Sequence, residues 1–314
     1  MGPPPTNLVP STTLASMSPS RLPVDAYTIG WVCALPLELA AASQVLDEEH
    51  EDPPYDEHDA NIYTLGRIGD HNVVIACLPA GQVGNNPAVA MQMRLRFPSV
   101  RIGLLVSIGG GVPSNRADIR LGDVVVSQPD GQHGGVVQFD RGKTEAEAAN
   151  HLRQRIKFTD FLKVFDTLPI FRRVTEDDVL FEPTYNHQGG LTCAECDTRW
   201  LAGRPPRTRD HIAIHYGTIA SGNQVTKDAL ARDRCSEELG GVLCFEMEAA
   251  GLMSTFPCLV IRGICDYADS HKNKKWQPYA AAVSATYAKE VLTVIPVADI
   301  SQTQPVNALG SQGI

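Results

Sequence analysis

Two carboxylates two positions apart interrupt an apolar stretch of this sequence. Glu246 and Glu248 flank Met247 in "CFEMEAAG", and small residues follow at once. Burying an unpaired carboxylate is costly, so the pair needs a physical reason. One interpretation is structural, because acids near the positive end of a helix dipole stabilise the start of a helix. The other is that the carboxylates bind the hydroxyl groups of a ligand.

Acids or glycines end three other apolar stretches. Glu38 falls in the expected first turn of a helix after "IGWVCAL", and Asp266 ends "CLVIRGICD". The run Gly109–Gly111 ends "RIGLLVSIGGG", where a glycine loop would let backbone N–H groups approach an anion or hydroxyl closely. The structural alternatives are a helix dipole for Glu38, an N-cap for Asp266 and a turn with positive φ for the glycines.

Together, these four strand ends predict one crevice that contains several carboxylates. The sequence around them has no Cys–His or Ser–His pairing typical of a covalent nucleophile, and no GK[ST] follows the glycines. Carboxylates without a metal cluster suit a reaction in which a proton is delivered to a leaving group while positive charge develops nearby.

A second group of reactive side chains lies in "HQGGLTCAEC". His187, Cys193 and Cys196 could bind zinc, but a fourth ligand and the usual second half of a zinc motif are not evident in the sequence. We therefore predict no metal and no cofactor. A structural metal in this loop is the alternative.

The expected elements are short apolar strands that alternate with helices. Strands that are apolar along their whole length are typical of a sheet covered on both faces. A hairpin is expected around the turn dipeptide Gly69-Asp70. The stretches 128–160 and 166–210 break the alternation, and loops of that length are usually functional or mobile. Helices are expected near residues 36–47, 86–97, 226–239 and 279–294.

Composition indicates how the chain is divided into a folded domain and two end segments. The 314 residues are 43% apolar and 20% charged, which is ordinary for a globular α/β domain. Residues 1–24 are rich in Pro, Ser and Thr and are predicted to be a disordered arm. We expect a single domain over residues 25–296 and a flexible tail or linker over residues 297–314.

Charge and hydropathy exclude some classes of partner. A formal charge of −9 disfavours binding of nucleic acid through a basic surface. The sequence has no apolar run of the roughly 20 residues that span a bilayer. Eight cysteines are scattered, mostly in apolar stretches, which suits reduced thiols. We expect a cytoplasmic protein that binds neither nucleic acid nor membrane.

Five segments, in family order, resemble the nucleoside phosphorylase and nucleosidase superfamily. They are "IGWVCALPLELAA", "VSIGGGVPS" with "RLGDVVVS", "IASGNQV", "FEMEAAG" and "RGICDYAD". More narrowly, the chain is similar to fungal domains of this type at the N-terminus of large immune-receptor-like proteins. The resemblance implies an α/β fold with a twisted, mixed, partly barrel-like central sheet flanked by helices. It also implies a homo-oligomer and fusion to regulatory domains in a longer protein.

The resemblance further implies roles for residues at the strand ends. Asp266 corresponds to the acid that protonates purine N7, and Glu248 to the carboxylate that binds the ribose hydroxyls. Met247 packs under the sugar, while Glu38 positions the attacking water with help from Glu246. The remaining substrate-binding candidates come from the glycines and the "ASGNQVT" segment that holds the base: Gly109, Gly110, Asn223, Gln224, Val225, Thr226 and Lys227.

Departures from the family pattern favour water over phosphate as the nucleophile. The phosphorolytic enzymes have an Arg near the start of the domain and another before the glycines, where this chain has "ALPLELA" and "LLVSIGGG". The basic ligands for inorganic phosphate are therefore missing. The aromatic residue that stacks on the base in the nucleosidases is replaced near Val225, and Ile108 stands where those enzymes often have Ser.

We therefore predict a purine N-ribosyl hydrolase that acts on adenine nucleosides or nucleotides, with ATP as a candidate substrate. Two alternatives stay open: a phosphate-dependent purine nucleoside phosphorylase, and a catalytically inactive nucleoside-sensing module. The phosphates of a nucleotide would contact lysines near the crevice: Lys227, Lys272, Lys274 and Lys275.

Overall fold

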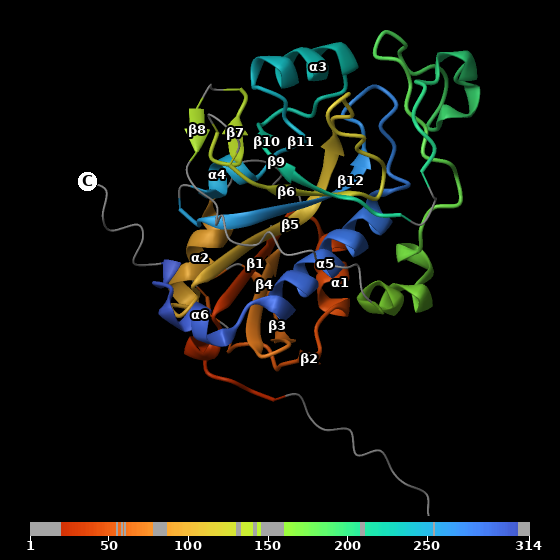
Figure 1. Ribbon diagram of the computed structural model, residues 1–314. Helices are drawn as coiled ribbons and strands as arrows, with labels where there is room; N and C mark the ends of the chain where they lie inside the picture. Colours follow the sequence, from red (N-terminus) through yellow and green to blue (C-terminus); the bar gives the residue numbers. More distant parts are fainter. Residues whose placement is uncertain are drawn as a thin grey trace, which may run out of the picture.

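A large mixed β-sheet with helices on both faces forms the centre of the molecule (Figure 1). The computed structural model describes residues 20–306, except 55, 58, 60, 78–86, 130–132, 141–142, 146–159, 208–210 and 254. The predicted α/β class is confirmed. In the described part of the chain, no helix has the length and apolar character needed to cross a membrane.

The sheet branches at β5 (Ile102–Gly111). β12 (Cys258–Asp266) runs parallel to β5, and the end of β5 also pairs antiparallel with β11 (Cys244–Glu246). β1 (Ile29–Cys33) pairs in parallel with β5, along the edge of β5 opposite β12. The remaining strands extend from these four: β2 (Glu48–Glu49), β3 (Ile62–Ile68), β4 (His71–Cys77), β6 (Val124–Ser127), β7 (Val136–Gln138), β8 (Lys143–Glu145), β9 (Ile214–Gly217) and β10 (Ile219–Ser221).

Successive side chains of a strand point to opposite faces of the sheet. The strands therefore contribute to two apolar clusters, one on each face. Trp31 of β1 packs in the cluster that contains α5 (Gln277–Val294), and its neighbour Val32 packs in the cluster that contains α2 (Ala88–Arg96). α1 (Pro36–Gln44) contacts α5, and α4 (Ala249–Met253) contributes to the α2 cluster. α3 (Ala229–Glu238) follows β10 in the chain. The expected burial of the sheet on both faces is confirmed.

Local turn chemistry explains the predicted hairpin. β3 and β4 pair antiparallel from Ile62 opposite Cys77 to Ile68 opposite His71. Gly69 in the connecting turn has φ of +56°, a conformation that glycine adopts at low cost. The prediction of a hairpin at Gly69-Asp70 is therefore confirmed.

The chain ends differ from the predicted boundaries where they are described. Ser20 forms a β-bridge with His50, although it falls in the predicted arm, and residues 1–19 lie outside the described residues. The predicted tail begins with a helix, α6 (Val297–Gln302), which buries Ile300. Val306 is also buried and donates its N–H to the Val100 carbonyl. These apolar anchors extend the ordered chain beyond residue 296.

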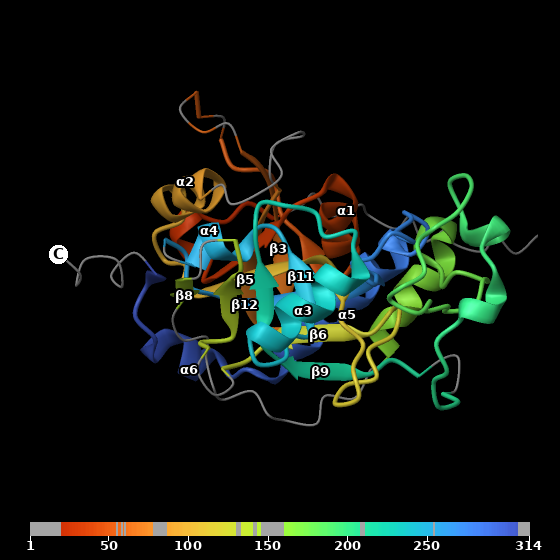
Figure 2. The same cartoon turned by 90° about the horizontal axis from the view of Figure 1, so that it is seen from above.

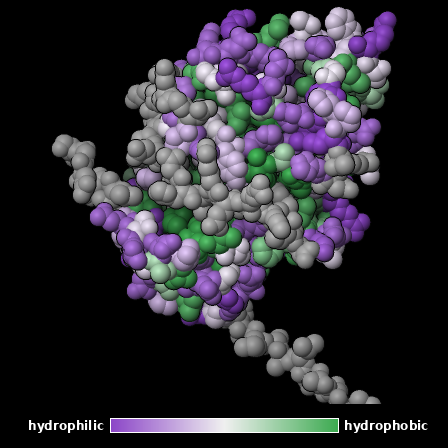
Figure 3. All heavy atoms as spheres, viewed as in Figure 1, coloured by the Kyte–Doolittle hydropathy of each residue, from purple (hydrophilic) through white to green (hydrophobic). Residues whose placement is uncertain are grey.

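The long polar stretch after residue 160 folds as an insertion of short 3-10 helices. These are η2 (Asp160–Thr167), η3 (Pro169–Phe171), η4 (Cys193–Glu195) and η5 (Thr198–Trp200), and η1 (Val24–Ala26) precedes β1. The insertion lies at one end of the molecule in two perpendicular views (Figures 1 and 2). Its visible surface is mostly hydrophilic (Figure 3).

Candidate active site

A cavity lies where the carboxyl ends of β1 and β5 meet the end of β11. It brings together most of the predicted site residues: Glu38, Gly109, Gly110, Gln224, Val225, Thr226, Glu246, Met247, Glu248 and Lys272. Residues not predicted from the sequence complete the lining: Ala34, Leu35, Ser107, Ile108, Phe245, Cys265, Ala268 and Gln277. The predicted candidates Asn223, Lys227 and Asp266 do not line this cavity.

A buried arginine from β12 holds the two carboxylates of "CFEMEAAG". Arg262 is fully buried and forms ion pairs with both Glu246 and Glu248, the latter at 3.2 Å between Nη1 and Oε2. Buried charges of this kind are tolerated when they are paired and hydrogen-bonded. Arg262 was not predicted as a site residue. The signal was available, since an arginine inside the otherwise apolar "CLVIRGICD" requires an acidic partner.

The two carboxylates differ in their surroundings. Glu246 accepts hydrogen bonds from the backbone N–H groups of Glu248 and Ala249 at the start of α4, at 3.1 and 3.0 Å. The structural interpretation of an acid at a helix start therefore applies to Glu246. Burial raises the pKa of Glu248 to about 8, against the opposing effect of the Arg262 guanidinium. Burial therefore makes Glu248 costly to ionise. Both carboxyl groups line the cavity.

Glu38 ties the start of α1 to β5. Its Oε2 accepts from the backbone N–H groups of Ala34 and Leu35 at 2.8 and 2.9 Å. Its Oε1 accepts from the Ser107 hydroxyl at 2.5 Å and from the Ile108 N–H at 3.0 Å. Burial raises the pKa of Glu38, while these hydrogen bonds act in the opposite direction. A carboxylate accepts about four hydrogen bonds, so a water molecule would compete with one of these donors for Glu38.

A bulge at the end of β12 sets the position of Asp266. The pairing with β5 shifts between Ile264 and Asp266, so that Asp266 lies opposite Gly110. Bulges of this kind redirect side chains near functional sites. The Asp266 carboxylate accepts from the Ala268 N–H at 2.9 Å and lies 3.1 Å from the Lys272 ammonium. Asp266 lines a neighbouring cavity, and Cys265 lines both cavities.

The three glycines belong to a strand, so the predicted glycine loop is wrong. Gly109, Gly110 and Gly111 complete β5, and none of them has positive φ. Close packing explains them instead. A Cβ at Gly109 would lie 2.5 Å from the Cys244 sulfur, and one at Gly110 would lie 2.8 Å from an Asp266 oxygen. Glycine is needed here because neighbouring strands and the acid approach the β5 backbone closely.

The predicted base-binding segment lies partly at the cavity and partly away from it. Gln224, Val225 and Thr226 line the cavity, and Val225 is 47% exposed. Asn223 is turned toward another loop, since its N–H donates to Asp140 at 3.0 Å. Lys227 is exposed. The whole segment was predicted to bind the base, but only its three central residues line the cavity.

The four predicted lysines have different surroundings. Lys272 lines the cavity, and 31% of its side chain is exposed. Lys275 forms an ion pair with Glu176 at 2.5 Å and lines the neighbouring cavity. Lys274 is exposed, as is Lys227. Among the described residues that line the first cavity, Lys272 is the only cation.

The chain matches one family model and several known proteins. A family model described as "Phosphorylase superfamily" matches residues 28–295. A nucleotide-binding leucine-rich repeat (NLR)-like protein from Hyaloscypha variabilis is 43% identical over 88% of this chain. The chain spans only 30% of that relative's length.

Two further relatives have nucleosidase names. A 5'-methylthioadenosine/S-adenosylhomocysteine nucleosidase from Mycobacterium bovis is 28% identical and is aligned over 87% of this chain and 98% of its own length. The ATP nucleosidase Cap17 from Escherichia coli is 22% identical over 82% of this chain and 50% of its own length. Among solved structures, the Helicobacter pylori 5'-methylthioadenosine/S-adenosyl homocysteine nucleosidase superposes with a TM-score of 0.54 at 18% identity, covering 86% of this chain and 99% of that one. At that identity the likeness concerns the fold.

Proposed function

Because the chain belongs to the phosphorylase superfamily, we propose that its cavity hydrolyses the N-glycosidic bond of adenine nucleosides or nucleotides. The observation that carries this proposal is the cavity lined by the paired carboxylates Glu246 and Glu248, in which Lys272 is the only cation among the described lining residues. Inorganic phosphate is normally bound by several basic groups. Water is therefore the better nucleophile for this cavity, and the nucleosidase relatives support the same choice.

The proposed reaction uses the Glu246 carboxylate, held by Arg262, to stabilise positive charge on the sugar. Glu248 binds the ribose hydroxyls, and hydrogen bonds donated by these hydroxyls favour its ionised form as the ring approaches an oxocarbenium ion. The C1′–N9 bond breaks and its electron pair passes to the base, which takes a proton from Asp266 at N7. The oxygen of water bonds to C1′, and the proton that it loses passes to a carboxylate of the site.

Glu38 is the proposed acceptor for the attacking water. Its four hydrogen bonds mean that one donor must move first. Three of the donors are backbone N–H groups, whereas the fourth is the Ser107 hydroxyl, which can rotate. We therefore propose that water enters beside Ser107, between Glu38 and the sugar.

Lys272 provides a reason for a nucleotide substrate. Its ammonium lies 3.1 Å from the carboxylate of Asp266, the proposed acid, and it is the only cation among the described residues that line the cavity. A phosphate group of a bound nucleotide would accept a charge-assisted hydrogen bond from this ammonium. We propose ATP as a substrate on this ground, with support from the ATP nucleosidase relative.

The proposed function is tested by separating the products formed from adenosine, AMP and ATP by chromatography, with and without inorganic phosphate. Hydrolysis predicts free adenine in both conditions. A requirement for phosphate would identify the phosphorylase alternative. Binding of nucleoside with no release of adenine would identify the sensing module.

We further propose a cytoplasmic homo-oligomer that forms part of a longer protein. All eight cysteines are among the described residues and form no disulfide there, which suits a reducing compartment. Met91 and Leu95 are 47% and 80% exposed one turn apart on α2, and an apolar face of this kind suits association between copies. Sedimentation analysis of the wild-type protein and of Leu95→Asp tests the oligomer. The NLR-like relative supports fusion to further domains.

A further inference from the structure

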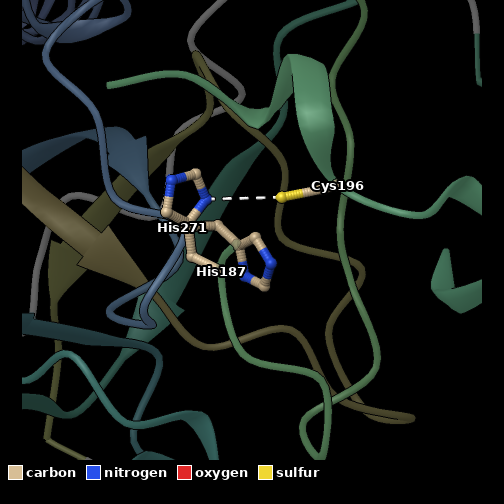
Figure 4. A group of neighbouring side chains, drawn as sticks. All are labelled: His187, Cys196 and His271. Atoms are coloured by element: carbon tan, nitrogen blue, oxygen red, sulfur yellow. Dashed lines mark hydrogen bonds between the residues drawn. The ribbon is translucent and has the colours of Figure 1, made fainter. Parts of the chain in front are cut away.

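A group of metal-ligating side chains lies outside the cavity, where the insertion meets the loop after β12. Ligand atoms of His187, Cys196 and His271 lie within 4.8 Å of one another (Figure 4). The Cys196 sulfur is 3.4 Å from His187 Nδ1. Cys193 is close as well, with its sulfur 3.8 Å from the same nitrogen. His271 comes from a distant part of the sequence and supplies the fourth ligand that sequence analysis did not find.

Each histidine has one ring nitrogen near an acceptor and another placed to bind a metal ion. His187 Nε2 lies 2.9 Å from the Gly190 carbonyl, which only accepts, so Nε2 carries the hydrogen and Nδ1 keeps its lone pair. His271 Nδ1 lies 3.8 Å from the Asp269 carboxylate, and its buried Nε2 has no hydrogen-bond partner among the described residues. Metal-bound histidines typically donate their second N–H to a carbonyl or carboxylate.

The surroundings hold these ligands in place. The His271 side chain is 8% exposed, and its ring stacks on Phe181 with ring centroids 4.1 Å apart. Cys196 is buried in a small apolar cluster with Phe181 and Tyr185. An unpartnered nitrogen that is buried and fixed by stacking is costly unless it has a ligand.

The two sulfur–nitrogen distances to His187 suit a tetrahedral site, whereas Cys193 would move closer to the group of His187, Cys196 and His271 on binding the ion. Zinc bonds to sulfur at about 2.3 Å and to nitrogen at about 2.0–2.1 Å, which places neighbouring sulfur and nitrogen ligands about 3.6 Å apart. The two sulfur–nitrogen distances to His187 Nδ1, 3.4 and 3.8 Å, lie on either side of that value. We propose that His187, Cys193, Cys196 and His271 bind one structural Zn²⁺, with both cysteines losing their thiol protons.

The zinc would connect the insertion to the cavity. His271 directly precedes Lys272, whose ammonium pairs with the proposed acid Asp266. The His187 N–H already donates to the Ser270 hydroxyl at 2.9 Å, so the two segments meet along several residues. Since structural zinc contributes directly to folding free energy, the ion would stabilise the loop that carries Lys272.

Metal content and a cobalt spectrum test the site without reference to activity. Protein purified without chelator is expected to contain about one zinc per chain by elemental analysis. Chelator-treated protein titrated with Co²⁺ is expected to give thiolate-to-cobalt absorption and tetrahedral d–d bands that saturate at one equivalent. Melting temperature should fall on removal of zinc and recover when zinc is added back.

Variants separate the proposed ligands from other cysteines and histidines. Cys196→Ser and His271→Ala should lose zinc and the cobalt bands. Cys235→Ser, which changes a partly buried cysteine of α3, and His211→Ala, which changes an exposed histidine, should retain both. Asp269→Asn should weaken zinc binding about tenfold, because it removes the negative charge near His271 Nδ1, while the Asn oxygen can still accept the His271 backbone N–H.

Three outcomes would overturn the proposal. The first is protein that holds no stoichiometric zinc and gives no cobalt bands after reduction and reconstitution. The second is unchanged zinc binding in Cys196→Ser and His271→Ala. The third is a disulfide between Cys193 and Cys196 in protein isolated with thiols blocked, detected as a bridged peptide two hydrogens lighter by mass spectrometry.

Discussion

Arg262 Nη1 lies 3.2 Å from Glu248 Oε2, and both side chains are buried beside the cavity. The same guanidinium pairs with Glu246, so one cation is shared by two carboxylates. This arrangement explains how the chain tolerates two acids in "CFEMEAAG". It also means that the proposed ribose-binding group is held by a residue that does not line the cavity.

Arg262→Met should destabilise the protein by about 3–5 kcal/mol, because it removes the buried cation that pairs with Glu246 and contacts Glu248. Arg262→Lys should recover part of this loss. It restores the positive charge, but its single ammonium does not reproduce the guanidinium that contacts both Glu246 and Glu248. Denaturant unfolding at pH 7 measures both effects, with the exposed Arg116→Met as control. If Arg262→Met unfolds at the wild-type midpoint, the ion pairs contribute nothing to stability.

Asp266→Asn should lower base release by about 10²–10⁴-fold, the usual contribution of a positioned acid. Asn can still accept the Ala268 N–H, so the fold should be retained. Single-turnover adenine release and the circular dichroism spectrum measure the two effects. Asp299→Asn, on the exposed face of α6, provides a control. Turnover within a few-fold of wild type would remove Asp266 from the mechanism.

Lys272→Met should affect nucleotides and nucleosides differently. Loss of a charge-assisted hydrogen bond to phosphate costs roughly 1.5–3 kcal/mol, so KM for ATP should rise by about tenfold or more. Adenosine has no phosphate to contact Lys272, so its turnover should be retained. Lys274→Met changes an exposed lysine nearby and should have little effect. Equal losses on ATP and adenosine would assign Lys272 a structural role only.

Glu248 should make the folded state less stable as pH rises. Its pKa increases from 4.5 in the unfolded chain to about 8 in the fold, mainly because of burial. Between these values the folded protein holds a proton that the unfolded chain has released, so the free energy of unfolding decreases with increasing pH. Glu248→Gln cannot titrate and should show a shallower decrease from pH 5 to pH 8.

Unfolding of wild type and Glu248→Gln in the same buffers measures this difference directly. Other groups titrate in both proteins and cancel in the comparison. Identical slopes would mean that Glu248 is ionised at the same pH in the folded and unfolded states.

Most of the fold follows from local sequence patterns. Apolar runs such as "IGWVC" and the Gly69-Asp70 turn predicted strands and a hairpin, because local propensity and burial agree at these positions. β7 and β8 were not predicted. They lie in a polar stretch where pairing of β7 with β10, and of β8 with β7, defines the strands more than local propensity does.

The site was predicted less completely because its key contacts join distant segments. Glu246 and Glu248 were identified, but their partner Arg262 belongs to another strand. The glycines of β5 were assigned to a loop, since the sequence does not show that Asp266 would pack against Gly110. His271 was missed for the same reason, because only the folded chain brings it to Cys196.

Incubation of adenosine and ATP with the protein in ¹⁸O-labelled water tests the proposed hydrolysis most directly. Mass spectrometry of the products should show free adenine together with ribose, or its phosphorylated form, carrying one labelled oxygen at C1. Because C1 hydroxyl groups exchange with water, a parallel reaction in unlabelled water with added ¹⁸O-phosphate is needed. The account predicts no transfer of phosphate oxygen to the sugar and an unchanged rate when phosphate is omitted. Ribose 1-phosphate that carries the phosphate label would contradict it.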